Sequence, residues 1–286
     1  MRKQTIIVLV AAVALAANSL ACCVVGWPAG VRGSGRVVEE TIEISDVTEV
    51  VLGTSGNLYV EYGDEASLLV EAEDNLVEYL DIHVHGDTLE IKTQAGTWLN
   101  PTRPIKFYLT VTELDAVSLT GSGDALVPDM EADQIELSVT GSGDLQVGDL
   151  DAERIELDLS GSGDLEAEDC EADEASIHVT GSGDVDLRDL HVGEITVRMT
   201  GSGNVTAVGG EVEKQDVSIT GSGDYTADGV KSDEAKVRLT GSGMADVRVS
   251  ERLNATILGS GDVHYVGDAE VESSTTGSGD VRKGND

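Results

Sequence analysis

The chain has 286 residues, of which 40% are hydrophobic but only 3% are aromatic, and it contains a single Phe. Its formal net charge of -36 comes from 54 Asp and Glu residues against 18 Lys and Arg residues. Such a charge repels nucleic acid and anionic lipid, so no nucleic-acid partner is expected. The aliphatic, ring-poor composition favours a narrow, elongated core over a globule packed around large rings.

Residues 1–21 have the pattern of a secretory signal. Arg2 and Lys3 precede an apolar run that is too short to favour a membrane span, and small residues follow it. Cys22 comes next, as in a bacterial lipoprotein signal, although the residues just before it depart from the usual order. We expect Cys22 to be lipidated and residues 22–36 to form a tether. Ordinary secretion with cleavage after Ala21 is the alternative.

Residues 37–112 alternate apolar and polar side chains, but without a strict period. Three of the four prolines and most of the large rings lie before the regular repeats that follow. We therefore expect a degenerate β-solenoid that caps the end of the repeats, because an open solenoid end invites pairing with other strands. Trp98 lies in a proline-flanked loop, where it is a candidate for partner binding or a part of the cap.

Residues 113–284 are organised by a repeated Gly-Ser-Gly triplet. At a constant spacing, the triplet begins at Gly121, Gly141, Gly161, Gly181, Gly201, Gly221 and Gly241. At a slightly shorter spacing, it returns at Gly259 and Gly277. Each repeat continues with a short apolar alternation, an acidic bend and a longer apolar alternation. A period this strict predicts one coil of a β-solenoid per repeat.

Side-chain alternation predicts which residues are buried. Ile135, Leu137 and Val139 alternate with polar residues, and the same pattern returns one repeat later. Side chains two positions apart lie on one face of a strand, so this apolar set should stack from coil to coil at about 4.8 Å. Cys170 is expected to be a small buried residue, and the triplet glycines to supply positive φ or close approach at a corner. Alanine at Gly163 should be poorly tolerated if its φ is positive.

The Gly-Ser-Gly-Asp repeats, together with the segments Glu71-to-Leu76 and Gly86-to-Ile91, resemble the bacterial head GIN-domain family of auto-transporter adhesins. The resemblance covers about Val37 to Asp280 and implies an exported β-helical protein, often tethered to the cell envelope, with no established catalytic residues. Together with the usual chirality of parallel connections, it also implies a right-handed solenoid.

The residue after each triplet forms an acidic column that could bind calcium between coils. Asn204 and Met244 interrupt the column, and turn aspartates commonly accept backbone N–H groups without a metal. Calcium therefore stays a weaker alternative, and no other cofactor is expected. The calcium candidates are Asp124, Asp144, Asp164, Asp184 and Asp224.

The sequence favours a non-catalytic function. Parallel β-helices also include polysaccharide-cleaving enzymes, but the regular repeats hold few aromatic residues and no recognisable catalytic arrangement. We expect an adhesin-like β-solenoid that presents an acidic surface to a partner in the envelope or at the cell surface. A lipid anchor would place it in the outer membrane, in the periplasm or at the cell surface; without one it would be secreted.

Overall fold

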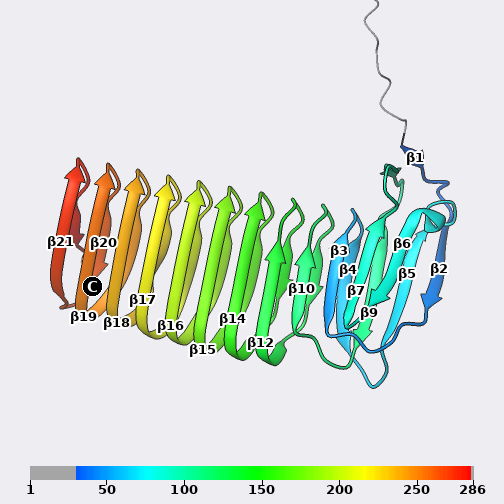
Figure 1. The fold of residues 1–286 in the computed structure, drawn as a ribbon, viewed down its shortest axis with the longest axis horizontal. Coiled ribbons are helices and arrows are strands. Elements are labelled where there is room, and N and C mark those ends of the chain that lie inside the picture. Colours follow the sequence, from blue (N-terminus) through cyan, green and yellow to red (C-terminus); the bar gives the residue numbers. More distant parts are fainter. Residues whose placement is uncertain (1–29, 285–286) are drawn as a thin grey trace, which may run out of the picture.

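The computed structural model describes residues 30–284, which form an elongated stack of parallel coils (Figure 1). The predicted all-β solenoid is confirmed. Cys22 and the predicted signal over residues 1–21 lie outside the described residues. Within residues 30–284, no helix is long and apolar enough to cross a membrane. The regular coils consist of β10 (Ala116–Leu119), β11 (Ala125–Val127), β12 (Met130–Val139), β13 (Leu145–Val147), β14 (Leu150–Gly161), β15 (Leu165–Gly181), β16 (Val185–Gly201), β17 (Val205–Gly221), β18 (Tyr225–Gly241), β19 (Ala245–Gly259), β20 (Val263–Val266), β21 (Glu270–Gly277) and β22 (Val281–Lys283).

Each coil pairs in parallel with the next through residues one repeat apart. Leu157 of β14 lies beside Ile177 of β15, and Ile177 lies beside Val197 of β16. All three side chains are at most 1% exposed. The alternation therefore places one apolar residue above another along the stack, and the resulting column forms a continuous aliphatic core.

The shortening of the repeat near the C-terminus is confined to the acidic bend. Ala227 of β18 pairs with Val247 of β19, but the next pair joins Lys231 to Arg248. The bend of β19 is therefore shorter than that of β18, while the long strand that follows regains its register at Glu234 and Arg252. One core position is lost in the shift, because Val230, which is 0% exposed, has no register partner in β19. The core positions of the long strand stay aligned, as in the pair of Val237 and Ala255.

Glycine is required at the corners of the solenoid for two different structural reasons. The first glycine of a triplet has a positive φ in several coils, for example +153° at Gly161. Gly163 has no positive φ; instead, a Cβ there would overlap the carbonyl oxygen of Gly143 in the preceding coil. The prediction that alanine is poorly tolerated at Gly163 therefore rests on the close approach of two backbones rather than on φ.

One polar pair interrupts the aliphatic core. The Tyr225 hydroxyl donates a hydrogen bond of 2.9 Å to Oε1 of Gln215, and both residues are 0% exposed. Ala235 and Ala245 hold the neighbouring register positions in the following coils, where small side chains leave room for the Tyr ring and the amide. Nε2 of Gln215 has no hydrogen-bond partner among the described residues.

The N-terminal region supplies two further coils and a cap. Its elements are β2 (Val37–Ile42), β3 (Glu49–Gly53), β4 (Asn57–Tyr62), β5 (Ser67–Glu73), η1 (Val77–Tyr79), β6 (Leu80–His85), β7 (Thr88–Thr93) and β9 (Lys106–Val111). Strand β3 lies between β7 and β10, and β4 lies between β9 and β11, all in parallel. The order of coils in space therefore differs from their order in the chain. Strands β2, β5 and β9 pair in antiparallel fashion and give the cap at this end (Figure 1).

A separate two-stranded sheet joins the start of the described chain to the proline-containing loop. Strand β1 (Val31–Arg32) pairs in parallel with β8 (Leu99–Asn100). The Val31 N–H also donates to the Trp98 carbonyl at 2.7 Å. The part of the predicted tether that the structure describes, residues 30–36, is thus paired with the fold beside Trp98.

Candidate functional site

The aspartates predicted to bind calcium form a hydrogen-bonded ladder along one corner of the solenoid. Oδ1 of Asp124 accepts the backbone N–H of Asp144 at 3.1 Å, and Oδ1 of Asp144 accepts that of Asp164 at 3.0 Å. Asp164 and Asp184 continue the pattern at 2.9 and 2.7 Å. Each carboxylate thus joins its own coil to the next one.

The interruptions of this column follow from the same hydrogen bonds. Asn204 continues the ladder, because its Oδ1 accepts the N–H of Asp224 at 3.0 Å. Asp224 in turn accepts the N–H of Met244, which has no side-chain oxygen to offer the following coil. The ladder requires an acceptor oxygen rather than a negative charge.

Calcium binding by the column stays a prediction. The ladder gives the aspartates a role in joining coils, and one oxygen of each carboxylate is already used by a backbone N–H. A calcium-dependent rise in the melting temperature, beyond that caused by sodium chloride of equal ionic strength, would establish the site. A shift that follows ionic strength alone would contradict it.

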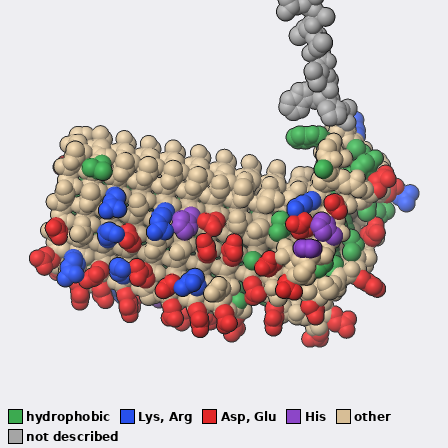
Figure 2. All heavy atoms as spheres, in the orientation of Figure 1, with side chains coloured by type: hydrophobic (Ala, Val, Ile, Leu, Met, Phe, Trp, Pro, Cys, Tyr) green, Lys and Arg blue, Asp and Glu red, His purple; other side chains and the backbone are tan. Residues whose placement is uncertain are grey.

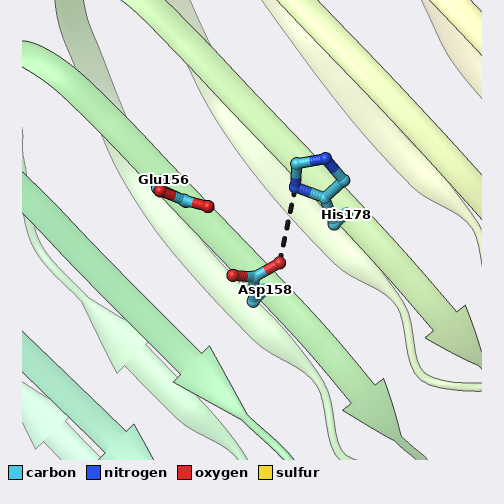
Figure 3. Close-up of side chains that lie close together, drawn as sticks. All are labelled: Glu156, Asp158 and His178. Atoms are coloured by element: carbon cyan, nitrogen blue, oxygen red, sulfur yellow. Dashed lines mark ion pairs between the residues drawn. The ribbon is translucent and has the colours of Figure 1, made fainter.

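A second group of metal-ligand types lies on the face of β14 and β15. Glu156, Asp158 and His178 bring one ligand atom each within 4.8 Å of one another (Figure 3). None of the five aspartates of the ladder belongs to this group. The sequence signal for it was present, because Asp158, His178 and Arg198 hold the same position in successive repeats and share one column of the solenoid.

The neighbours of His178 favour an ion-pair column over a metal site. Arg198 places a guanidinium nitrogen 3.2 Å from Nε2 of His178. Since a guanidinium can only donate, Nε2 must accept, and the ring proton is then on Nδ1. Nδ1 lies 3.4 Å from Oδ1 of Asp158, within ion-pair distance, but it has no hydrogen-bond partner among the described residues. Nε2 therefore faces the Arg198 guanidinium and Nδ1 faces the Asp158 carboxylate, an arrangement that favours ion pairing between coils over metal binding.

An acidic groove follows the bends of β12, β14 and β15. Its floor is formed by Ala132, Ala152 and Ala172, and its volume is about 590 Å³. Figure 2 shows acidic side chains gathered along one long edge of the solenoid. The residues lining the groove include no Lys or Arg. The carboxylates on its two rims are Glu131, Asp151 and Glu171 on one side and Asp133, Glu153 and Asp173 on the other.

The acidic groove changes character toward the C-terminus. His191 and Gly193 hold the rim positions of β16, and Lys231 forms an ion pair of 2.7 Å with Glu211 farther along. Carboxylates therefore line both rims over three successive coils, as the acidic residues that recur at the bend of each repeat predict.

Two predicted positions differ in exposure. Trp98 is 63% exposed, so the loop presents its ring to solvent rather than to the core of the cap. Cys170 is 2% exposed, as predicted, and burial raises the pKa of its thiol to about 12. A thiol so protected is a packing residue and not a nucleophile.

Comparisons with known proteins agree with this architecture. The family model described as "Putative auto-transporter adhesin, head GIN domain" matches residues 46–208 and 168–269. No curated protein matches the sequence.

Among solved structures, a "putative adhesin" from Parabacteroides merdae is 21% identical, with a TM-score of 0.68 over 90% of this chain and 99% of that chain. A "putative lipid binding protein" from Parabacteroides distasonis is 24% identical, with a TM-score of 0.67 over 90% and 100%. A "putative adhesin" from the same organism is 22% identical, with a TM-score of 0.62 over 89% and 100%. These likenesses show a shared fold. Because the family model covers most of the chain, the protein belongs to the head GIN-domain family of adhesin-like β-solenoids, as its motifs predicted.

Proposed function

We propose that this chain is an exported, non-catalytic interaction protein of the cell envelope, anchored through Cys22, whose acidic groove binds a cationic segment of a surface partner. The observation that supports this function most directly is the row of carboxylates on both rims of the acidic groove, whose lining contains His191 at one end but no Lys or Arg. Membership of an adhesin-like family supports the same class of function.

The groove is suited to an extended cationic ligand because its charged residues are aligned along the stack. Residues Glu131, Asp151 and Glu171 follow one another in register, so neighbouring carboxylates are about 4.8 Å apart along the stack. Exposed charges at this spacing repel by only about 0.9 kcal/mol in water, a cost that the fold can sustain. The same array attracts lysine and arginine side chains, and the attraction weakens as salt is added.

A charge-matched pair of variants tests the groove. In the groove variant, the six rim carboxylates become the corresponding amides, and binding to fluorescent Lys- and Arg-rich peptides is measured by anisotropy at two salt concentrations. We expect binding at least about tenfold weaker and a smaller salt dependence. The control neutralises six exposed carboxylates outside the groove, namely Glu39, Glu40, Glu43, Asp64, Glu65 and Glu272. If peptide binding were weakened equally in both variants, the loss would be explained by net charge alone, and the proposal would be contradicted.

The anchor is tested separately, in the organism that makes the protein. Labelled fatty acid should enter the wild-type chain and not the Cys22→Ala variant, which should appear in the soluble fraction. Mass spectrometry of the mature N-terminus distinguishes the alternative. An unmodified Cys22 after cleavage at Ala21 would establish ordinary secretion and leave the groove hypothesis unaffected.

A further inference from the structure

One end of this strongly acidic molecule is locally basic. The segments 30–36 and 94–104 contain three arginines and Trp98, but no Asp or Glu. Arg32, Arg36 and Arg103 are all exposed, and the Arg36 side chain is 77% exposed. Among the described residues, Arg32 and Arg103 have no carboxylate within ion-pair distance, and Arg36 has Asp74 at 3.5 Å. We call this surface, formed by Arg32, Arg36, Arg103 and Trp98, the tether-end surface.

The two segments form a single surface because a buried carboxylate holds them together. Glu73 is 0% exposed and accepts the N–H of Gly35 at 2.5 Å and the N–H of Thr102 at 2.7 Å. The Thr102 hydroxyl also donates to Glu73 at 2.6 Å. Pairing of β1 with β8 adds a second connection on the Trp98 side. The position of Trp98 relative to the arginines is therefore set by the fold.

Elsewhere in the solenoid, three exposed arginines are neutralised by the adjacent coil, whereas Arg198 and Arg238 have no carboxylate within ion-pair distance among the described residues. Arg154, Arg188 and Arg252 lie 2.8, 2.9 and 3.0 Å from glutamates one coil away. The tether-end surface lacks this neutralisation at two of its three arginines, and it also presents a large exposed ring. Hydrophobic side chains gather at the same end of the molecule in Figure 2.

We propose that the tether-end surface docks on the surface of a phospholipid bilayer, with Trp98 in the interfacial layer and the arginines against lipid phosphates. Trp is favoured at membrane interfaces because one end of the indole is apolar and the other can hydrogen-bond. Arginine pairs its planar guanidinium with phosphate. The net charge of the whole molecule opposes contact with anionic lipid, so only this end approaches the bilayer.

The length of the preceding chain is compatible with such contact. Gly30 follows Cys22 by only eight positions, which span a distance of about 28 Å at full extension. An anchor on Cys22 would keep Trp98 near the bilayer and raise the effective concentration of the docking surface. The surface itself does not require the anchor, so this inference holds even if Cys22 carries no lipid.

The test uses the chain from residue 22 onward with Cys22→Ala and Cys23→Ala, which contains every described strand and cannot be acylated at these positions. Cosedimentation with vesicles of phosphatidylcholine and phosphatidylglycerol gives the affinity. Trp98→Ala, and separately the triple change Arg32→Ser, Arg36→Ser and Arg103→Ser, should each weaken binding at least about tenfold. The charge-matched control changes Arg154, Arg188 and Arg252 to Ser and should bind as the parent does. Circular dichroism and melting temperature verify that each variant is folded.

A fluorescence measurement locates the ring directly. The chain has two Trp residues, so in a Trp27→Phe background Trp98 is the sole Trp, and excitation at the long-wavelength edge of Trp absorption avoids the tyrosines. Its emission should shift to shorter wavelength on vesicles and be quenched by brominated lipid. Failure of the parent to bind vesicles would overturn the proposal, as would equal losses in the two arginine triples. Displacement from vesicles by dextran sulfate, with binding to that polymer independent of Trp98, would reveal a general polyanion site and would also overturn it.

Discussion

Substitution of Gly163 by alanine tests the close packing of the coils. A Cβ at this position would overlap the carbonyl oxygen of Gly143 and lie 2.9 Å from its carbonyl carbon. The obstructing atoms are backbone, so no side-chain rotation relieves the overlap. The two coils must separate locally, although they are joined at this corner by backbone hydrogen bonds such as that from Ser162 to Gly141 at 3.1 Å.

The expected cost follows from two contributions. Overpacking of a well-packed region costs about 1–3 kcal/mol. Weakening two hydrogen bonds between the coils at this corner adds about 1 kcal/mol each. The sum is about 4 kcal/mol, which corresponds to a fall in melting temperature of about 8–16 °C for a domain of this size.

Thermal and urea unfolding of the Gly163→Ala variant would measure this cost. Gly209→Ala is the matched control, because its nearest non-neighbouring atom, Oδ1 of Asp189, is 3.5 Å from the added Cβ. That control should be neutral or more stable by about 0.4–1 kcal/mol, since alanine restricts the unfolded chain. If the two variants had the same stability within about 1 kcal/mol, the argument from backbone contact would be refuted.

Three further predictions concern buried groups. Tyr225→Phe should lower the free energy of unfolding by about 1–3 kcal/mol, because it leaves Oε1 of Gln215 unpaired, and adding Gln215→Leu should recover much of the loss; a larger loss in the double variant would contradict this. Cys170, with its raised pKa of about 12, should resist a thiol reagent at pH 8 until urea unfolds the chain, and rapid labelling of the native protein would show that its burial is wrong. Hydrogen bonds, chiefly from the Thr102 hydroxyl, lower the pKa of Glu73 below 4.5 in the folded protein. The ionised Glu73 carboxylate therefore stabilises the fold above pH 4.5, and this stabilisation is lost as the pH falls through the lowered pKa of the folded state. Glu73→Gln should therefore be less stable at pH 7 and lose less stability on acidification; parallel stability curves for the two proteins between pH 7 and pH 3 would contradict the assignment.

The period of the sequence was sufficient to predict most of the solenoid. Residues one repeat apart must meet once each repeat forms one coil, so the burial of Ile177 and the alignment of the Asp column both followed from spacing. The same rule accounts for the contacts of His178 with Asp158 and Arg198, which hold the same position in successive repeats. The cause of the expected alanine intolerance at Gly163 could be identified only from the folded structure, because the spacing of the repeats does not distinguish a positive φ from a close backbone contact.

The spatial order of the strands in the N-terminal region was decided by tertiary structure. Its alternation predicted strands, but the position of β3 between β7 and β10 emerges only in the folded chain, since strands in a degenerate region carry no period to fix their partners. Likewise, Glu73 meets Gly35 and Thr102 from distant positions in the chain. The sequence by itself thus determined the coil, its core positions and its acidic surface, because a repeat fixes its own neighbours. The order of the capping coils and the joining of Trp98 to the tether end depend on contacts that occur once, and these only the folded chain defines.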